Sequence, residues 1–220
     1  YQDLKYAEKI HQRYTDGGRL EFEKDKFYVT ASAYYQSGKN STGKNINAFY
    51  IQPEIKYTVP ENLTLRLGVE IFSGDNGKVK SASDHNFIAL YGVAHRFNGS
   101  MDYFTTFPAD FNNAGLVNPY LFAIKDIGKK IQMRADFHLF YTQNHFVQNK
   151  ETISRYLGYE NDWLLTYKPN SYAKIDLGVS YLIPTKSLEI IKKGSDSAYI
   201  PTWAYLSITF KPQLLKTIFK

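Results

Sequence analysis

The sequence predicts an all-β fold, a transmembrane antiparallel β-barrel, and three observations point to this class. Segments of roughly ten residues, apolar at every second position, recur from about Arg19 to Phe210. The connections between them are short, then long, then short again. No window approaches the ~18 to 20 consecutive apolar residues that a membrane helix needs, and the mean hydropathy is -0.42.

The alternation is clearest in residues 62–73. The apolar set comprises Leu63, Leu65, Leu67, Val69 and Ile71, and the other set comprises Thr64, Arg66, Gly68, Glu70 and Phe72. Successive side chains of a strand point to opposite faces, so one face is apolar and the other largely polar. A soluble β-sandwich also alternates, but its strands are shorter, about five or six residues. Strands of about nine or more residues match a tilted membrane crossing.

Turn chemistry divides the chain into strands in a fixed order. Short turns are expected at residue 25 and at residues 60–62, 126–129 and 169–171, and long polar segments at residues 37–44, 73–115, 142–154 and 184–201. The predicted strands are residues 18–23, 27–36, 46–57, 63–72, 116–125, 131–142, 156–167, 172–183 and 202–210. Outer-membrane barrels place short turns in the periplasm and long loops outside the cell, which gives each strand a direction.

The number of strands is odd, about nine, whereas single-chain bacterial barrels normally have an even number. We therefore expect residues 1–220 to be part of one larger barrel domain whose N-terminal strands precede residue 1. The opening at Tyr1 and the lack of a signal peptide favour this. The alternative is an independent small barrel that gains a strand from residues 87–97. Residues 212–220 form a basic amphipathic tail.

Four stretches also resemble a known family. They are AYYQSGK at residues 33–39, GVEIFSGD at 68–75, HRFNGSMDYF at 95–104 and LGYENDWLLTYKP at 157–169. In this order they are similar to the C-terminal half of the alginate export family of outer-membrane porins. The resemblance implies a barrel of ~18 strands in the outer membrane of Gram-negative bacteria, with ~9–10 of them in this chain. It further implies passive diffusion or export of an anionic polysaccharide or small polar solutes.

Charged and polar residues on the polar face predict the lining of a pore. The candidates are Lys56, Arg66, Glu70, Arg134, Asp136, His138, Glu160, Asp162, Lys174 and Asp176. Rows of both signs can orient polar solutes, although ion pairs that only brace the wall explain them equally well. Arg66 and Arg134 are the expected anion contacts, because guanidinium binds carboxylates as a fork.

The connection at residues 73–115 is predicted to be an extracellular loop that folds inward as a constriction, because about forty residues is long for a loop without function. Its candidate residues are His95, Arg96, Gly99 and Asp102. Gly99 permits a positive φ at the Asn98–Gly99 turn, and Asp102 can pair with Arg96. A loop that merely packs on the rim is the alternative.

Charge and motif content exclude several functions. The net charge is +6, but the basic residues form no stripe or aromatic platform for nucleic acid. Lysines in the long segments can attract polyanions or hold lipopolysaccharide phosphates. The five histidines include no i, i+4 pair and cysteine is absent, so no metal site, cofactor or enzymatic activity is expected. Asp136 and His138 share a face but point inward, away from substrates in the lipid.

The sequence thus favours a porin-like channel in the bacterial outer membrane. Its expected partners are outer-membrane lipid and lipopolysaccharide, an anionic saccharide or small solute, the barrel-assembly machinery and other envelope proteins. A non-conducting structural barrel subunit of a larger cell-envelope complex, with a plugged lumen, is the second hypothesis. A soluble sugar-binding β-domain is the third, and it would fractionate without detergent.

Overall fold

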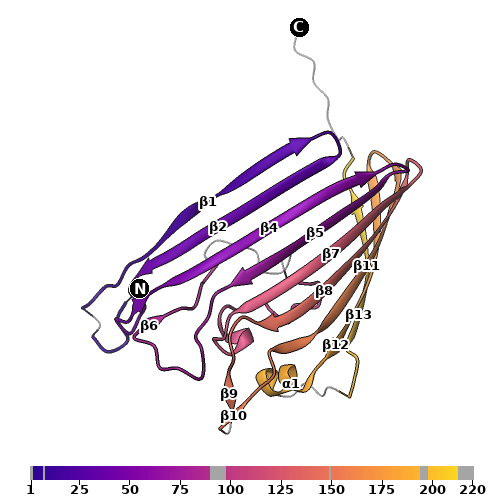
Figure 1. Cartoon of the computed structure of the whole chain (residues 1–220). Coiled ribbons are helices and arrows are strands. Elements are labelled where there is room, and N and C mark those ends of the chain that lie inside the picture. Colours follow the sequence, from indigo (N-terminus) through magenta and orange to yellow (C-terminus); the bar gives the residue numbers. More distant parts are fainter. Residues whose placement is uncertain (1, 7, 90–97, 149, 194–197, 213–220) are drawn as a thin grey trace.

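The computed structural model describes residues 2–6, 8–89, 98–148, 150–193 and 198–212, and one antiparallel sheet of nine strands dominates it (Figure 1). In sheet order, the strands are β1 (Arg13–Lys24), β2 (Phe27–Gly38), β4 (Ala48–Val59), β5 (Leu63–Phe72), β7 (Leu116–Ile127), β8 (Ile131–Thr142), β11 (Tyr156–Asn170), β12 (Ala173–Pro184) and β13 (Thr202–Phe210). Strand order along the sheet follows the chain, so the prediction of an all-β antiparallel fold is confirmed.

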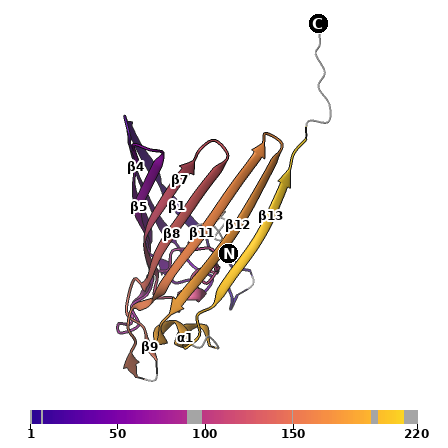
Figure 2. The same ribbon diagram turned by 90° about the vertical axis from the view of Figure 1, so that its right-hand side faces the viewer.

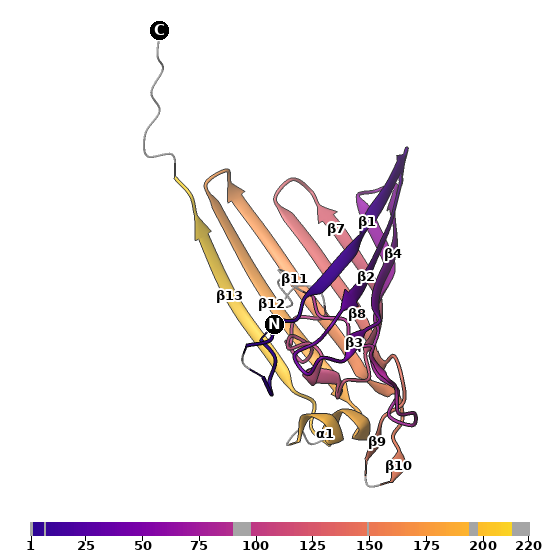
Figure 3. The same ribbon diagram turned by 90° about the vertical axis from the view of Figure 1, so that its left-hand side faces the viewer.

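The sheet bends into a trough and is open. Figure 3 shows β13 and β1 as its two edges, with loop segments lying between them. Among the described residues, each edge strand pairs on one side only, β1 with β2 and β13 with β12. The sheet does not close among the described residues, so the larger barrel stays a prediction, and the independent small barrel considered as the alternative is not observed there.

All nine predicted strands are present, with shifted ends. The first is longer than predicted and begins at Arg13. The third is divided: β3 (Asn45–Ile46) pairs in parallel with β6 (Ser83–Asp84), and β4 begins at Ala48. Strand β11 continues past Pro169 because its register with β12 shifts between Tyr167 and Asn170, and such an irregularity tolerates proline.

The extra strand considered for residues 87–97 is not seen where the structure describes them, since residues 87–89 belong to no strand. Residues 90–97, and all but the first residue of the 212–220 tail, lie outside the described residues. In the part of the chain that is described, no helix is both long and apolar enough to cross a membrane.

The two ends of the sheet differ as the turn chemistry predicts. Short hairpins join β1 to β2, β4 to β5, β7 to β8 and β11 to β12 at one end (Figures 1 and 2). Residues with positive φ make these turns tight, at Asp25 (54°), Asn62 (61°) and Gly128 (68°). The opposite end carries the long connections with β9 (Val147–Gln148), β10 (Glu151–Thr152), η2 (Ala109–Phe111) and α1 (Lys186–Lys192).

The two faces of the sheet have opposite character. We call the face outside the trough the outer face, and every strand of the sheet contributes exposed apolar side chains to it. Examples are Leu20, Phe22, Val29, Ile55, Leu67, Leu121, Met133, Leu139, Leu165, Leu177, Val179, Leu206 and Ile208. The inner face carries the charged residues singled out from the sequence, so the alternation in the sequence corresponds to two distinct surfaces.

A hydrophobic core fills the inside of the trough at its long-loop end. We call it the loop-side core, and its fully buried side chains include Phe104, Phe111, Leu116, Phe140, Leu157, Leu182 and Leu188. The rings of Phe104 and Phe140 lie 4.5 Å apart between centroids. An ion pair of 2.6 Å between Lys192 Nζ and Asp110 Oδ1 joins α1 to η2. The long connections therefore pack into the trough at this end.

Three tyrosine rings lie on glycines of the neighbouring strand. Tyr34, Tyr120 and Tyr205 are the direct cross-strand partners of Gly17, Gly68 and Gly178. A Cβ atom at any of these glycines would clash with the ring opposite. Each pair therefore fixes a tyrosine flat against the inner wall.

Candidate functional site

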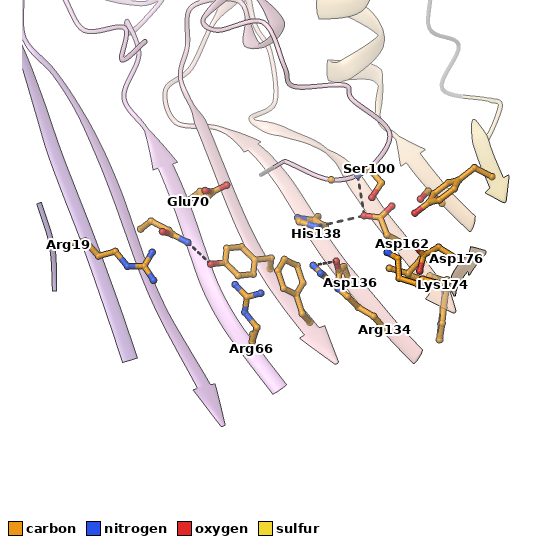
Figure 4. Close-up of a pocket in the computed structure, with 18 residues that line it drawn as sticks. Arg19, Arg66, Glu70, Ser100, Arg134, Asp136, His138, Asp162, Lys174 and Asp176 are labelled. Carbon is orange, nitrogen blue, oxygen red and sulfur yellow. Dashed lines mark hydrogen bonds and ion pairs between the residues drawn. The ribbon is translucent and has the colours of Figure 1, made fainter. Parts of the chain in front are cut away.

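A cavity of about 640 Å³ lies on the inner face, between the loop-side core and the short-hairpin end (Figure 4). Eight of the predicted pore-lining residues line it: Arg66, Glu70, Arg134, Asp136, His138, Asp162, Lys174 and Asp176. Of the other two, Lys56 lies 4.6 Å from the centre of the Tyr28 ring, and Glu160 is fully buried. Alternation alone therefore identified most of the polar wall.

Arg66 on β5 and Glu54 on β4 form the first charged pair of the wall. Arg66 Nε and Nη2 donate hydrogen bonds of 3.1 and 2.7 Å to Glu54 Oε1 and Oε2. The Tyr120 hydroxyl also donates to Glu54 Oε2, at 2.8 Å. Such a forked contact fixes the guanidinium plane, so Arg66 is held against the wall while remaining 30% exposed to the cavity.

Arg134 and Asp136, both on β8, form the second pair. The Arg134 guanidinium reaches Asp136 Oδ1 at 2.7 Å and Oδ2 at 2.6 Å. Both arginines also lie over the Phe122 ring, at 5.1 Å for Arg66 and 4.8 Å for Arg134. One aromatic ring therefore contacts two cations.

Lys174 and Asp176 on β12 form the third pair, with 2.5 Å between Nζ and Oδ2. The Thr166 hydroxyl on β11 donates to Asp176 Oδ1 at 2.7 Å. With Arg19, which pairs with Glu21 at 2.6 Å, the cavity wall therefore carries four cations, each next to a carboxylate. This arrangement gives a strongly polar surface without a large excess of either charge.

Tyr120 and Phe122 were missed by the sequence analysis. They alternate with outward residues on β7 and face inward beside the two arginines. A search for charged residues passes over this strand because its inward positions are mostly apolar or aromatic. The signal that identifies them is the same alternation, read for ring side chains instead of charges.

A second group of carboxylates lies deeper, at the boundary with the loop-side core. The backbone N–H of Met101 donates to Glu160 Oε1 at 2.8 Å, and that of Ser100 donates to Asp162 Oδ2 at 3.3 Å. The Tyr50 hydroxyl donates to Glu70 Oε1 at 2.9 Å. Glu70 and Glu160 are 2% and 0% exposed, so these carboxylates are buried under the loop instead of facing the cavity openly.

Gly99 brings the loop into contact with this group. It has a φ of 80°, as its position in the Asn98–Gly99 turn predicts. A Cβ atom at this position would lie 2.5 Å from Glu160 Cδ. The loop therefore enters the trough and touches its wall here, while Asp102 adopts a φ of 59° in the same segment. His95 and Arg96 lie outside the described residues, so the Arg96–Asp102 pair stays a prediction.

His138 lies in a buried chain of amides that ends in the loop. Its Nδ1 is 3.1 Å from Asn118 Oδ1, Asn118 Nδ2 is 3.4 Å from Asn98 Oδ1, and Asn98 Nδ2 donates to the Phe104 carbonyl at 3.2 Å. On its other side, His138 Nε2 is 3.9 Å from Asp162 Oδ2. The loop and the sheet thus share one polar network.

Comparison of the sequence with models of known protein families and with curated proteins finds no match. The chemistry of the site has to be inferred from its own residues. These offer a polar cavity with four ion pairs, an aromatic ring beside two guanidinium groups, and a buried group of carboxylates with one imidazole.

Proposed function

We propose that the chain forms part of a β-barrel in a bacterial outer membrane, and that its inner face lines a passage for anionic saccharides or small polar solutes. The observation that carries this proposal is the apolar outer face, to which all nine strands contribute exposed side chains. A continuous apolar surface of this kind is unfavourable in water and is matched by lipid.

Strand length supports the same assignment. Most strands of the sheet have 12 residues, which corresponds to about 40 Å of extended chain. At a tilt of about 45° such a strand spans roughly 28 Å, close to the hydrocarbon thickness of a bilayer. The arrangement of short hairpins at one end and long connections at the other is also typical of outer-membrane barrels.

The open edges favour a larger closed structure. In lipid, each unpaired backbone N–H and C=O group costs several kcal/mol, so β1 and β13 need strand partners. Further strands between these two edges would complete the wall. This supports the interpretation of the chain as about half of a larger barrel, as the resemblance to the alginate export family implies.

Anionic solutes fit the cavity wall because Arg66 and Arg134 both line the cavity and both lie close to the Phe122 ring. A solute carboxylate can bind the guanidinium edges that remain exposed, and a sugar ring can pack on the aromatic surface. The resemblance to the alginate export family favours a polyuronate among such solutes.

A non-conducting barrel is the second candidate, and the loop-side core favours it. Phe104, Phe111 and Leu188 are fully buried inside the trough, and a close-packed apolar core leaves no room for water-sized solutes. In that case the barrel acts as a structural subunit of a larger envelope complex.

The test is single-channel recording from the full-length protein in a planar lipid bilayer, with a salt gradient and with or without added polyuronate. We expect steady conductance that favours anions and that the polymer blocks. Arg66→Ala with Arg134→Ala should reduce anion selectivity. Lys24→Ala with Lys125→Ala removes the same charge from outward positions near the hairpin end and serves as the matched control.

Two results would separate the candidates. Absence of conductance from a folded, heat-modifiable barrel would favour the plugged structural subunit. If the double arginine variant conducts with unchanged selectivity, the protein is still a channel, but the two arginines are not its anion contacts.

A further inference from the structure

We propose that Asp136, His138 and Asp162 form a binding site for a divalent transition-metal ion of the Zn²⁺ or Mn²⁺ type. The cluster lies on the inner face beneath residues Gly99 and Ser100 of the loop (Figure 4). It is independent of whether the barrel conducts, because every residue in it is placed by the sheet and the loop of this chain.

The sheet brings the three side chains together from two strands. Asp136 and His138 are two residues apart on β8, and Asp162 on β11 is the direct cross-strand partner of Asp136. One possible ligand atom from each lies within 4.8 Å of the other two, and all three residues are buried. In a tetrahedral site with metal bonds of about 2.0 to 2.2 Å, the ligand atoms lie about 3.3 to 3.6 Å apart, so the side chains need to close by up to about 1.5 Å.

The orientation of His138 favours a metal ligand. The Phe104 carbonyl can only accept, so Asn98 donates to it through Nδ2 and accepts from Asn118 through Oδ1. Asn118 then offers its Oδ1 to His138, which places the imidazole proton on Nδ1. The lone pair of Nε2 consequently faces Asp162 Oδ2, 3.9 Å away. Two acceptors that face each other repel, and a proton or a metal ion between them relieves this repulsion.

The surroundings of the carboxylates also favour a bound cation. Asp136 is paired with Arg134, but the hydrogen-bonding groups around Asp162 are neutral serine donors, among them the Ser100 N–H at 3.3 Å, and the carboxyl group of Glu160. Asp162 Oδ1 and the Oε2 of neighbouring Glu160 are buried with no hydrogen-bond partner among the described atoms. Buried acceptors are nearly always satisfied, and buried charges are paired or coordinate metals. A bound cation would neutralise this group.

The ligand set selects the class of ion. One imidazole nitrogen with carboxylate oxygens suits Zn²⁺ and Mn²⁺, whereas Ca²⁺ and Mg²⁺ prefer oxygen ligands alone. The Asn118 contact on Nδ1 is the kind of outer hydrogen bond that orients a metal-binding histidine. Because that contact continues through Asn98 to Phe104, metal binding would also fix the loop against the wall.

The test uses the full-length protein, purified without a histidine tag and treated with EDTA. Bound metal is measured by elemental analysis and by calorimetric titration with Zn²⁺, Mn²⁺ and Ca²⁺. Co²⁺ binding is followed by its visible absorption, which reports ligand geometry. The variants are Asp162→Asn and His138→Gln, and Asp126→Asn is the matched control, because Asp126 faces inward on β7 outside the cluster.

We expect one Zn²⁺ per chain and at least tenfold weaker binding in both cluster variants, with Asp126→Asn like the wild type and Ca²⁺ unable to compete. Heat-modifiable gel mobility identifies variants that fail to fold. If a variant does not fold, the proposal is still decided by the number of metal ions bound per wild-type chain and by the Co²⁺ spectrum of the wild type. A folded wild-type protein that binds no stoichiometric transition metal, or that binds it equally well in Asp162→Asn, would overturn the proposal.

Discussion

The charged groups of the inner face are arranged differently on the two sides of the loop that contacts the wall at Gly99. Towards the short hairpins, Arg66 and Arg134 each hold a carboxylate through two short hydrogen bonds and remain about one-third exposed. Towards the loop-side core, Glu70 and Glu160 are almost completely buried and accept hydrogen bonds from neutral donors. The same alternation in sequence therefore produces two kinds of wall. In one, the carboxylates are paired with cationic side chains, and in the other they are not.

This difference indicates what each side does. In the proposed channel, the paired, half-exposed charges would form the hydrated surface along which a solute passes. Buried carboxylates without a cationic side chain raise the free energy of the folded protein unless they are neutralised. One of them, Glu160, accepts a hydrogen bond from Met101 of the loop, so this carboxyl group contributes directly to the contact between loop and wall.

The largest effect is expected from Phe104→Ala, which removes a fully buried ring of the loop-side core. Loss of its packing against Phe140 should lower the free energy of unfolding by about 3 to 5 kcal/mol. Urea unfolding of the full-length protein, read by heat-modifiable gel mobility, measures this. Val79→Ala, at an exposed position of the same loop, should stay within about 0.5 kcal/mol. Equal effects of the two would mean that the loop does not pack into the trough.

Neutralising one carboxylate on each side should change stability in opposite directions. Glu54→Gln leaves Arg66 with a poorer partner and should destabilise by about 1 to 2 kcal/mol, since the pair is partly exposed. Glu160→Gln keeps an acceptor for the Met101 N–H and removes the cost of burying an ionisable carboxyl group, and it should stabilise the EDTA-treated protein by about 1 kcal/mol. Urea unfolding midpoints of both variants give the comparison. If both variants changed the stability in the same direction, the proposed difference between the carboxylates of the two sides would be wrong.

A smaller loss is expected from Gly68→Ala. The new methyl group displaces the Tyr120 ring, whose hydroxyl donates a hydrogen bond to Glu54 and accepts one from Gln52. We expect a cost of about 1 kcal/mol. Gly18→Ala is the matched control, because a Cβ there meets nothing within 4 Å, and it should be neutral or slightly stabilising. Differential scanning calorimetry distinguishes the two, and a Gly18→Ala loss as large as that of Gly68→Ala would contradict the steric explanation.

The smallest effect concerns the ion pair between Lys192 and Asp110, which joins α1 to η2. Both side chains are mostly buried, at 20% and 18% exposure, so Lys192→Met should cost about 0.5 to 1 kcal/mol. Limited proteolysis of the loop end is the sensitive measurement, with Lys150→Met, in an exposed turn, as control. Unchanged protease resistance in Lys192→Met would show that the loop-side core alone holds α1.

Alternation predicted the strands, their order and the residues of the inner face, because the period of a strand is a local property of the sequence. The Asp136–Asp162 contact could not be predicted in this way, since it depends on the register of β8 with β11 across a long connection. The absence of a histidine pair at positions i and i+4 argued against a metal site. That criterion considers one helix or strand at a time, so it does not detect a group of side chains that comes from two strands. The packing of Phe104 inside the trough is likewise a long-range contact, and the loop sequence alone does not specify it.

The glycine–tyrosine pairs have a consequence for the assembly of the sheet. A hairpin turn aligns the two strands it connects, but a long connection leaves their alignment undetermined. Two of the three pairs, Gly68 with Tyr120 and Gly178 with Tyr205, join strands that are separated by long connections. A slip of two residues would place the Tyr120 ring on Arg66 or Glu70 instead of on a glycine. These two pairs therefore penalise wrong registers at the places where no hairpin turn aligns the strands.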